Sequence, residues 1–281
     1  MRILRKFGIG LVLLLSLSGL LWSQFRGQRG GYTNLEGISS GGEYQGKAGE
    51  FHFIRLEYRD LFFASRGFGF GSRNGMGRGW WMVDWPDADQ HITTGIQRLT
   101  RIQMGEPRHI PMDNRIFDYP WVYATQTGWW SLSDEETKRL REYLERGGFL
   151  MTDDFWSSEE WQTFAGTMAK VLPGRDILDI SPEEPIMHVL YDIKERTFIP
   201  GSRHLCGSRR GGGGYGICQP QGTTPTWRMM YDDRDRAIVA VNYQMDVADA
   251  WEFADDPAYP EAMTALATRF GINYIIYSMT H

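Results

Sequence analysis

The sequence has little of what marks the common enzyme classes. It holds two cysteines in 281 residues, and no G-x-S-x-G or G-x-C-x-G nucleophile elbow stands at the end of any predicted strand. Its six histidines form no H-x-H or H-E-x-x-H pair, and no D-x-D-x-D-G calcium loop is present. These absences predict no metal site, no cofactor and no nucleophilic catalysis, and they favour a protein that is not an enzyme.

The chain also lacks a net positive charge. The formal net charge is -5 at pH 7, which provides no basic field for a nucleic-acid partner. Hydrophobic residues make up 42% of the chain and aromatic residues 14%, which is enough for one sizeable core. No internal repeat is visible. The composition therefore predicts one globular domain with an appendage.

The N-terminus has the pattern of an export signal. Arg2, Arg5 and Lys6 precede an apolar run of 15 residues, 7–21. That run is shorter than the ~20 residues of a membrane-spanning helix and is typical of a secretory signal. Residues 1–23 are therefore predicted to be a signal peptide or, alternatively, an uncleaved N-terminal anchor. We expect a periplasmic or extracellular protein that touches the membrane only through this segment.

A glycine-rich segment follows the signal. It is interpreted as a flexible tether over residues 24–50, and a single α/β domain is predicted over residues 51–281. Cys206 and Cys218 flank a loop with four consecutive glycines at 211–214. In an exported chain, two cysteines at this spacing predict one disulfide that closes the loop.

Strand and helix patterns alternate through the domain. Two helices have capping boxes at their starts, one from Ser133 to Glu136 and one from Ser157 to Glu160. The alternation predicts a mostly parallel sheet. Strands are predicted at 51–58, 119–125, 149–153, 176–180 and 272–279 and on both sides of a turn at 232–235; helices are predicted at 87–104, 133–146, 157–172, 259–271 and, briefly, after Pro185.

Ligands of open α/β sheets bind beyond the carboxyl ends of the strands, and here those ends carry acidic and aromatic residues. The candidate ligand-binding residues are Arg55, Tyr58, Trp129, Asp153, Asp154, Trp156 and Asp246.

The dipeptide Asp153-Asp154 ends one of the predicted strands. Adjacent strand residues point to opposite faces, so we expect Asp153 to face the ligand and Asp154 to cap the next helix or turn the chain. A turn-and-cap role for both aspartates is the alternative. Asp153, Asp154 and Asp246 could also supply oxygens to a hard cation, although no metal-binding spacing supports it.

Tryptophans are abundant, at 11 in the chain, and several fall in loops. Exposed rings beside carboxylates suit sugar or peptide recognition, or else they cover the core beneath long loops. The Gly-rich insertion at 66–79 precedes no helix start, so it predicts a surface loop or a flap rather than a phosphate cradle.

Residues 119–156, "YPWVYATQTGWWSLSDEETKRLREYLERGGFLMTDDFW", resemble the bacterial family called domain of unknown function 4159. The likeness continues in "WPDADQHI" and "GINYIIYSMTH" and covers nearly all of residues 51–281. It implies a class I glutamine amidotransferase-like fold, a flavodoxin-like three-layer sandwich. It implies no activity, because the amidotransferase elbow cysteine has no counterpart: Cys206 and Cys218 lie in the late glycine-rich loop.

Together these features predict an exported envelope module that binds a glycan, a peptide or a protein partner without catalysis. The alternative is a hydrolase of envelope carbohydrate or peptide that uses Asp153 and Asp246. A scaffold that docks a partner through the tryptophan loops of residues 66–82 is a third hypothesis.

Overall fold

A seven-stranded sheet organises the part of the chain that this computed structural model describes, residues 49–61, 79–194, 197–206, 216–217 and 226–281. The strand order is β2-β1-β3-β4-β9-β8-β5. Strands β2, β1, β3, β4 and β9 run parallel, and β8 and β5 are each antiparallel to the neighbour before them. The strands are β1 (Ile54–Glu57), β2 (Arg108–Pro111), β3 (Trp121–Thr125), β4 (Phe149–Asp153), β5 (Leu178–Asp179), β8 (Thr226–Tyr231) and β9 (Ala237–Tyr243), with β6 (Leu205–Cys206) and β7 (Gly216–Ile217) forming a separate pair.

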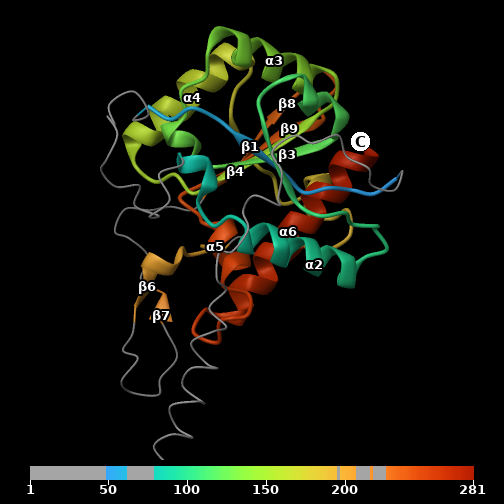
Figure 1. Ribbon diagram of the computed structural model, residues 1–281, viewed down its shortest axis with the longest axis vertical. Helices are drawn as coiled ribbons and strands as arrows, with labels where there is room; N and C mark the ends of the chain where they lie inside the picture. The colour runs from blue at the N-terminus through green and yellow to red at the C-terminus, as the bar shows by residue number, and fades with distance from the viewer. Residues whose placement is uncertain (1–48, 62–78, 195–196, 207–215, 218–225) are drawn as a thin grey trace, which may run out of the picture. The chain divides into compact units, whose positions relative to one another are not determined.

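Helices cover both faces of the sheet, with α3 and α4 on one face and α2, α5 and α6 on the other (Figure 1). The side chains of β3 explain the two layers. Val122 and Ala124 pack with the α3 and α4 side, whereas Trp121 and Tyr123 pack with the other. Because alternate strand residues point to opposite faces, a strand buried on both faces is apolar throughout. The helices are α2 (Asp87–Leu99), α3 (Asp134–Glu145), α4 (Ser158–Val171), α5 (Val247–Glu252) and α6 (Glu261–Thr280).

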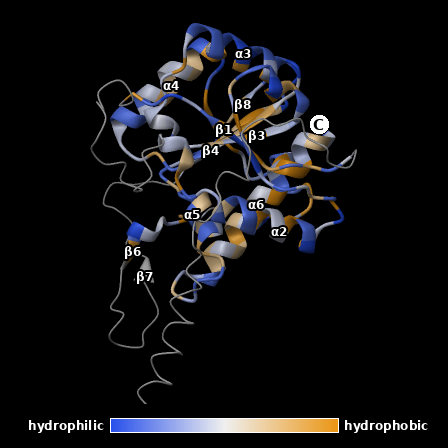
Figure 2. Ribbon diagram, in the orientation of Figure 1, coloured by the Kyte–Doolittle hydropathy of each residue, from blue (hydrophilic) through white to orange (hydrophobic). Residues whose placement is uncertain are grey.

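Hydrophobic residues are concentrated along the central strands, whereas the visible surface of α3 is mostly hydrophilic (Figure 2). Each face of the sheet has its own buried apolar cluster. A mostly parallel α/β architecture is thus confirmed. Among the helices of the described ranges, none has both the length and the apolar character that a bilayer crossing requires.

Local sequence signals determine where two of the helices begin. At α3 the capping box is complete, because the Ser133 hydroxyl accepts the Glu136 N–H and the Glu136 carboxylate accepts the Ser133 N–H. At α4 the Ser157 hydroxyl accepts the Glu160 N–H at 3.2 Å, but the Glu160 carboxylate accepts the N–H of Trp156. The second capping box is therefore shifted by one residue.

The end of the chain differs from the prediction of a helix followed by a strand. Residues 261–280 form one continuous helix, α6. Gly271 does not end it: a β-carbon there would lie 2.8 Å from Cζ2 of Trp251, so glycine permits close helix packing. The β-branched and aromatic run 272–279 lies in a helix that is buried on nearly all sides, since residues 270–275 are buried in succession. Tertiary burial here overrides strand propensity.

Other predictions need smaller corrections or remain predictions. The first strand is shorter than expected, β5 has two residues, and the segment after Pro185 forms one turn of 3-10 helix, Pro185–Met187. Residues 1–48 and most of the glycine-rich insertion lie outside the described residues. Cys218 does also, so the signal, the tether and the disulfide stay predictions.

Arg55, predicted to bind a ligand, is instead part of the core. Its side chain is fully buried in β1 and forms an ion pair with Asp89 of α2. Its Nη1 donates to the Val83 carbonyl at 2.7 Å and to the Trp81 carbonyl at 3.1 Å. The guanidinium thus joins the first strand, the first helix and the segment between them.

Removing this guanidinium should destabilise the fold. Arg55→Met is expected to lower the free energy of unfolding by about 3–5 kcal/mol, because Asp89 would remain as a buried unpaired charge. Urea unfolding at neutral pH measures the change. The double variant Arg55→Met/Asp89→Leu should recover most of the loss, and a loss below about 1 kcal/mol in the single variant would contradict the assignment.

Candidate functional site

The register of the parallel strands brings several chain segments to one edge of the sheet. Thr125 of β3 pairs with Asp153 of β4, and Asp153 pairs with Asn242 of β9. The residues that follow these three strands therefore leave the sheet side by side. The segment that begins at η1 (Trp80–Met82) reaches the same edge, because Arg55 holds its carbonyl groups.

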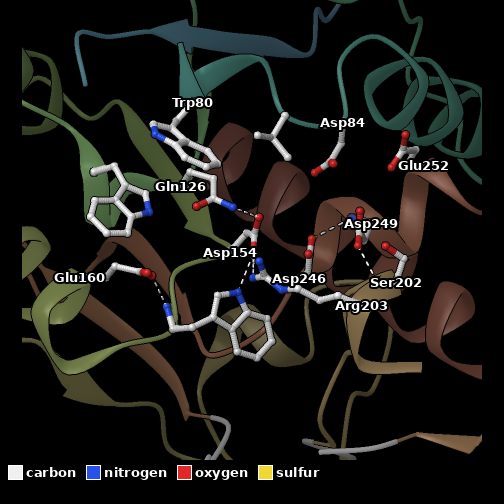
Figure 3. A pocket seen from close by; sticks show the side chains of 13 residues that line it. Trp80, Asp84, Gln126, Asp154, Glu160, Ser202, Arg203, Asp246, Asp249 and Glu252 are labelled. Atoms are coloured by element: carbon white, nitrogen blue, oxygen red, sulfur yellow. Dashed lines mark hydrogen bonds and ion pairs between the residues drawn. The ribbon is translucent and has the colours of Figure 1, made fainter. Parts of the chain in front are cut away.

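These segments enclose a cavity of about 620 Å³ (Figure 3). Its volume lies in the range of small-molecule sites. Six of its described lining residues are acidic, three are tryptophans and one is an arginine. The lining residues are Trp80, Val83, Asp84, Gln126, Trp129, Asp154, Trp156, Glu160, Ser202, Arg203, Asp246, Asp249 and Glu252.

The prediction that Asp153 faces the ligand is wrong. Asp153 is fully buried beneath the cavity and does not line it. Its Oδ2 accepts the N–H groups of Val247 and Ala248 at 2.8 and 3.0 Å, and its Oδ1 accepts the Tyr123 hydroxyl at 2.6 Å. Asp153 therefore secures the start of α5, the role expected of its neighbour. Burial raises its pKa to about 6, and these hydrogen bonds act in the opposite direction.

Asp154 is the aspartate that lines the cavity. Its backbone has a φ of 52°, a left-handed conformation that turns the chain from β4 towards α4. Its side chain accepts from Trp156 Nε1 at 2.6 Å, from Arg203 Nη2 at 2.9 Å and from the Gln126 amide. Burial raises the pKa of Asp154 to about 8, although the charge of Arg203 lowers it.

The cavity has an aromatic end and an acidic end. In Figure 3, Trp80, Gln126 and Glu160 lie on one side, and Asp249 and Glu252 lie on the other. At the aromatic end, the Trp80 and Trp129 rings stack with their centroids 6.3 Å apart, at 24°. Trp156 links this end to Asp154: its backbone N–H donates to Glu160, and its indole Nε1 donates to Asp154 at 2.6 Å.

The acidic end comes mainly from α5. Asp246 caps that helix by accepting the Asp249 N–H at 2.9 Å, and Asp249 accepts the Ser202 N–H at 2.6 Å. Burial, reinforced by neighbouring carboxylates, raises the pKa of Asp246 and of Asp84 well above the usual range and that of Glu252 to about 8. Acidic groups are thus crowded into a partly dry space that favours their neutral form, and a bound cation would favour their ionised form.

Two groups of carboxylates within the described chain could hold a metal ion. One comprises Asp84, Asp249 and Glu252, and the other comprises Asp84, Asp154 and Asp246. In each group, one oxygen from every residue lies within 4.8 Å of the others. Asp84 belongs to both groups.

Four of the seven predicted residues line the cavity, namely Trp129, Asp154, Trp156 and Asp246. The other three lie beneath it. Besides Arg55 and Asp153, these include Tyr58, which is buried and whose hydroxyl lies 2.7 Å from the Thr125 carbonyl oxygen.

Sequence reasoning missed Asp84, Asp249 and Glu252, among others. The spacing Asp246, Asp249, Glu252 offered a signal, since residues three apart share one face of a helix. No sequence pattern indicated Asp84, because it reaches the cavity from a loop that the buried Arg55 holds in place.

Comparison with known families agrees with the resemblance seen in the sequence. The model of a domain of unknown function, DUF4159, matches residues 70–279. The chain belongs to the DUF4159 family. Among curated proteins no match was found. The family description assigns no activity, so any function of this DUF4159 domain must be argued from the cavity.

The buried carboxylates should make the stability of this DUF4159 domain depend on pH. The folded pKa of Asp154 is about 8, against 3.8 ordinarily, so between these values only the unfolded chain releases the proton. The free energy of unfolding should therefore fall as pH rises from 5 to 8, by up to about 1.4 kcal/mol per pH unit for each such group.

Urea unfolding at several pH values tests this expectation. Asp154→Asn should flatten the fall, because it removes one titrating group. Asp179→Asn is the matched control, since Asp179 is 73% exposed and pairs with Arg228 outside the cavity. A profile that rises between pH 5 and 8, or an unchanged slope in Asp154→Asn, would show that these carboxylates are ionised in the folded chain.

Proposed function

We propose that this DUF4159 domain is an exported, non-catalytic binding module whose cavity takes a positively charged group of an envelope peptide or amino sugar. The excess of charge carries the proposal: six acidic side chains and one arginine are among the described residues that line the cavity. Unmatched carboxylates in a partly dry space favour a cation over a neutral or anionic ligand. Export rests on the signal-like pattern of residues 1–23.

Arg203 illustrates how such a group would bind. Its guanidinium lies 5.1 Å from the centre of the Trp156 ring and forms an ion pair with Asp154 at 2.9 Å. An aromatic face and a carboxylate together are a favourable site for an organic cation. The half-exposed Arg203 side chain can move aside, and a guanidinium or ammonium of a ligand would then meet the same partners.

The fold inferred from the family resemblance fits this role. We infer a glutamine amidotransferase-like fold, supported by the parallel strand order β2-β1-β3-β4-β9, which corresponds to the 2-1-3-4-5 order of flavodoxin-like sheets. The switch point of such an order lies between β1 and β3, next to the cavity-lining segments after β3 and β4. The position where a nucleophile elbow would follow a strand carries Asp154 rather than cysteine.

Binding of short peptides tests the proposal. An arginine- or lysine-containing peptide should bind the purified chain in calorimetry, whereas the same peptide with glutamine should bind at least about tenfold more weakly. Trp129→Ala and Asp154→Asn should each weaken binding by a similar factor. Trp161→Ala is the matched control, since Trp161 is a half-buried tryptophan that does not line the cavity. Equal affinity for both peptides would exclude a charge-selective module.

A hydrolase is the second candidate, and Asp154 favours it. A carboxyl group whose pKa is about 8 stays protonated at neutral pH and can act as a general acid. Asp154 takes the acid role predicted for Asp153, and Asp246 remains its partner. Their oxygens lie within 4.8 Å of each other, which is too close for the about 6.5–9.5 Å separation of inverting glycosidases.

Turnover of chromogenic glycosides or peptides distinguishes this candidate. If the domain is a hydrolase, Asp154→Asn should lower kcat by at least about a hundredfold, because the acid is lost. Asp179→Asn should leave kcat unchanged. A folded, cation-binding chain that turns over none of a broad panel of substrates would exclude hydrolysis.

A further inference from the structure

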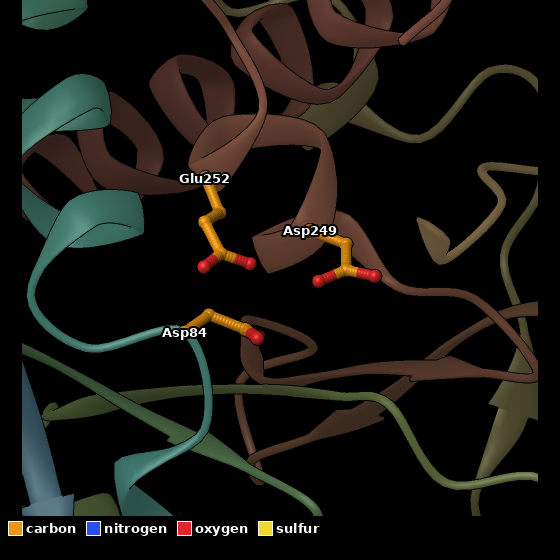
Figure 4. Close-up of side chains that lie close together, drawn as sticks. All are labelled: Asp84, Asp249 and Glu252. Carbon is orange, nitrogen blue, oxygen red and sulfur yellow. The ribbon is translucent and has the colours of Figure 1, made fainter. Parts of the chain in front are cut away.

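We propose that the acidic end of the cavity binds one hard divalent cation through Asp84, Asp249 and Glu252. Figure 4 shows the three carboxylates, from the loop before α2 and from α5, pointing toward a common space. One oxygen of each lies within 4.8 Å of the other two. Oxygens at this spacing need only small side-chain shifts to lie 2.3–2.6 Å from one Ca²⁺ ion. This site goes beyond the binding of an organic cation at the aromatic end.

Asp84 supplies an observation that is independent of the clustering. Its Oδ2 atom is excluded from solvent, and within the described ranges it has no hydrogen-bond partner. A buried carboxylate oxygen without a partner loses its hydration and gains nothing in return. Several buried indole and hydroxyl groups of the core share this state, but in the described ranges Asp84 Oδ2 is the only carboxylate oxygen that does. Because a carboxylate is the costliest of these groups to bury unpaired, this oxygen points to a partner that is not part of the protein chain.

The backbone around Asp84 fixes the position of its side chain at the cavity wall. Asp84 has a φ of 65°, and the carbonyl of the preceding Val83 is held by the buried Arg55. On the opposite side, Asp249 and Glu252 are three residues apart in α5 and share one face of that helix. Two separately anchored elements therefore converge on one space.

The donor set selects the class of ion. All three ligands are carboxylates, and the metal-binding groups found in the described chain contain no histidine or cysteine. Oxygen-only sites favour Ca²⁺, Mg²⁺ or Mn²⁺ over zinc or copper. Three carboxylates also exceed the charge of one divalent ion, so binding would relieve repulsion among them.

The neighbouring group of Asp84, Asp154 and Asp246 is less suited to a metal. Both Asp154 oxygens already accept hydrogen bonds, from Trp156 and Arg203 on one and from Gln126 on the other. The positive charge of Arg203 also opposes an approaching cation. Asp249 accepts the Ser202 N–H on Oδ2, and its side chain also hydrogen-bonds that of Glu252, a contact that a shared metal ion would replace. No positive side chain is paired with this group in the described ranges, so it is the more available.

Calorimetry of the chelator-stripped full chain, titrated separately with CaCl₂, MgCl₂ and MnCl₂, tests the site. We expect saturable binding of at least one of these ions near one equivalent, with an increase in Tm. Asp84→Asn and Glu252→Gln should each weaken binding at least about tenfold. Asp176→Asn, an exposed carboxylate away from the cavity, should bind like the wild type.

A second readout separates loss of the site from loss of the fold. Without metal, Asp84→Asn should raise Tm at pH 8, because it removes a carboxyl group that ionises more readily in the unfolded chain than when buried among other carboxyl groups. The same variant should lose the increase in Tm that the ion causes in the wild type. Wild-type binding that both variants leave unchanged, or folded wild type that binds none of the three ions at millimolar concentration, would overturn the proposal.

The outcome is independent of the proposed function. Asp154→Asn should lose the arginine peptide, because its carboxylate lies at the aromatic end, and should keep the metal. If a primary amine rather than a metal ion saturates the Asp84 group, the divalent site is wrong and the organic-cation function stands. If metal binds but no charged peptide does, the metal site stands and the proposed function is wrong.

Discussion

The parallel register of β3, β4 and β9 is the constraint on which the whole cavity depends. It aligns Thr125, Asp153 and Asn242 in one row, so three distant chain segments leave the sheet at the same edge. Each segment carries polar or acidic residues, and helices on both faces limit their access to water. The crowding of carboxylates is therefore a product of strand register, and their raised pKa values follow from that burial.

Two kinds of buried charge serve different purposes in this molecule. The Arg55 guanidinium binds Asp89 and a backbone carbonyl, and the Asp153 carboxylate accepts three hydrogen bonds. Both charged groups are therefore fully partnered, and each joins separate elements of the fold. Asp84 keeps a buried oxygen without a partner in the described chain. Satisfied charges specify structure, whereas an unsatisfied one indicates a ligand.

Much of the fold could be predicted from local patterns. The Ser133 capping box and the apolar runs of β3 and β4 are signals contained within a few residues, and the structure confirms them. The prediction of a helix at 259–271 and a strand at 272–279 is wrong, because the chain continues as one helix through Gly271, which accommodates Trp251 of α5. The roles of Asp153 and Asp154 were exchanged, since pleat alternation does not show which face meets a helix and which meets a cavity.

The sequence by itself determined the alternation of helices and strands, the family and the presence of acidic and aromatic residues after the strands. These depend on short-range periodicity and capping, which act within one or two turns of chain. Only the tertiary structure decided that Asp84 and Glu252 meet, and that Arg55 and Tyr58 lie beneath the cavity. Such contacts join residues from distant parts of the chain, and their partners are set by packing on the sheet, which no local pattern encodes.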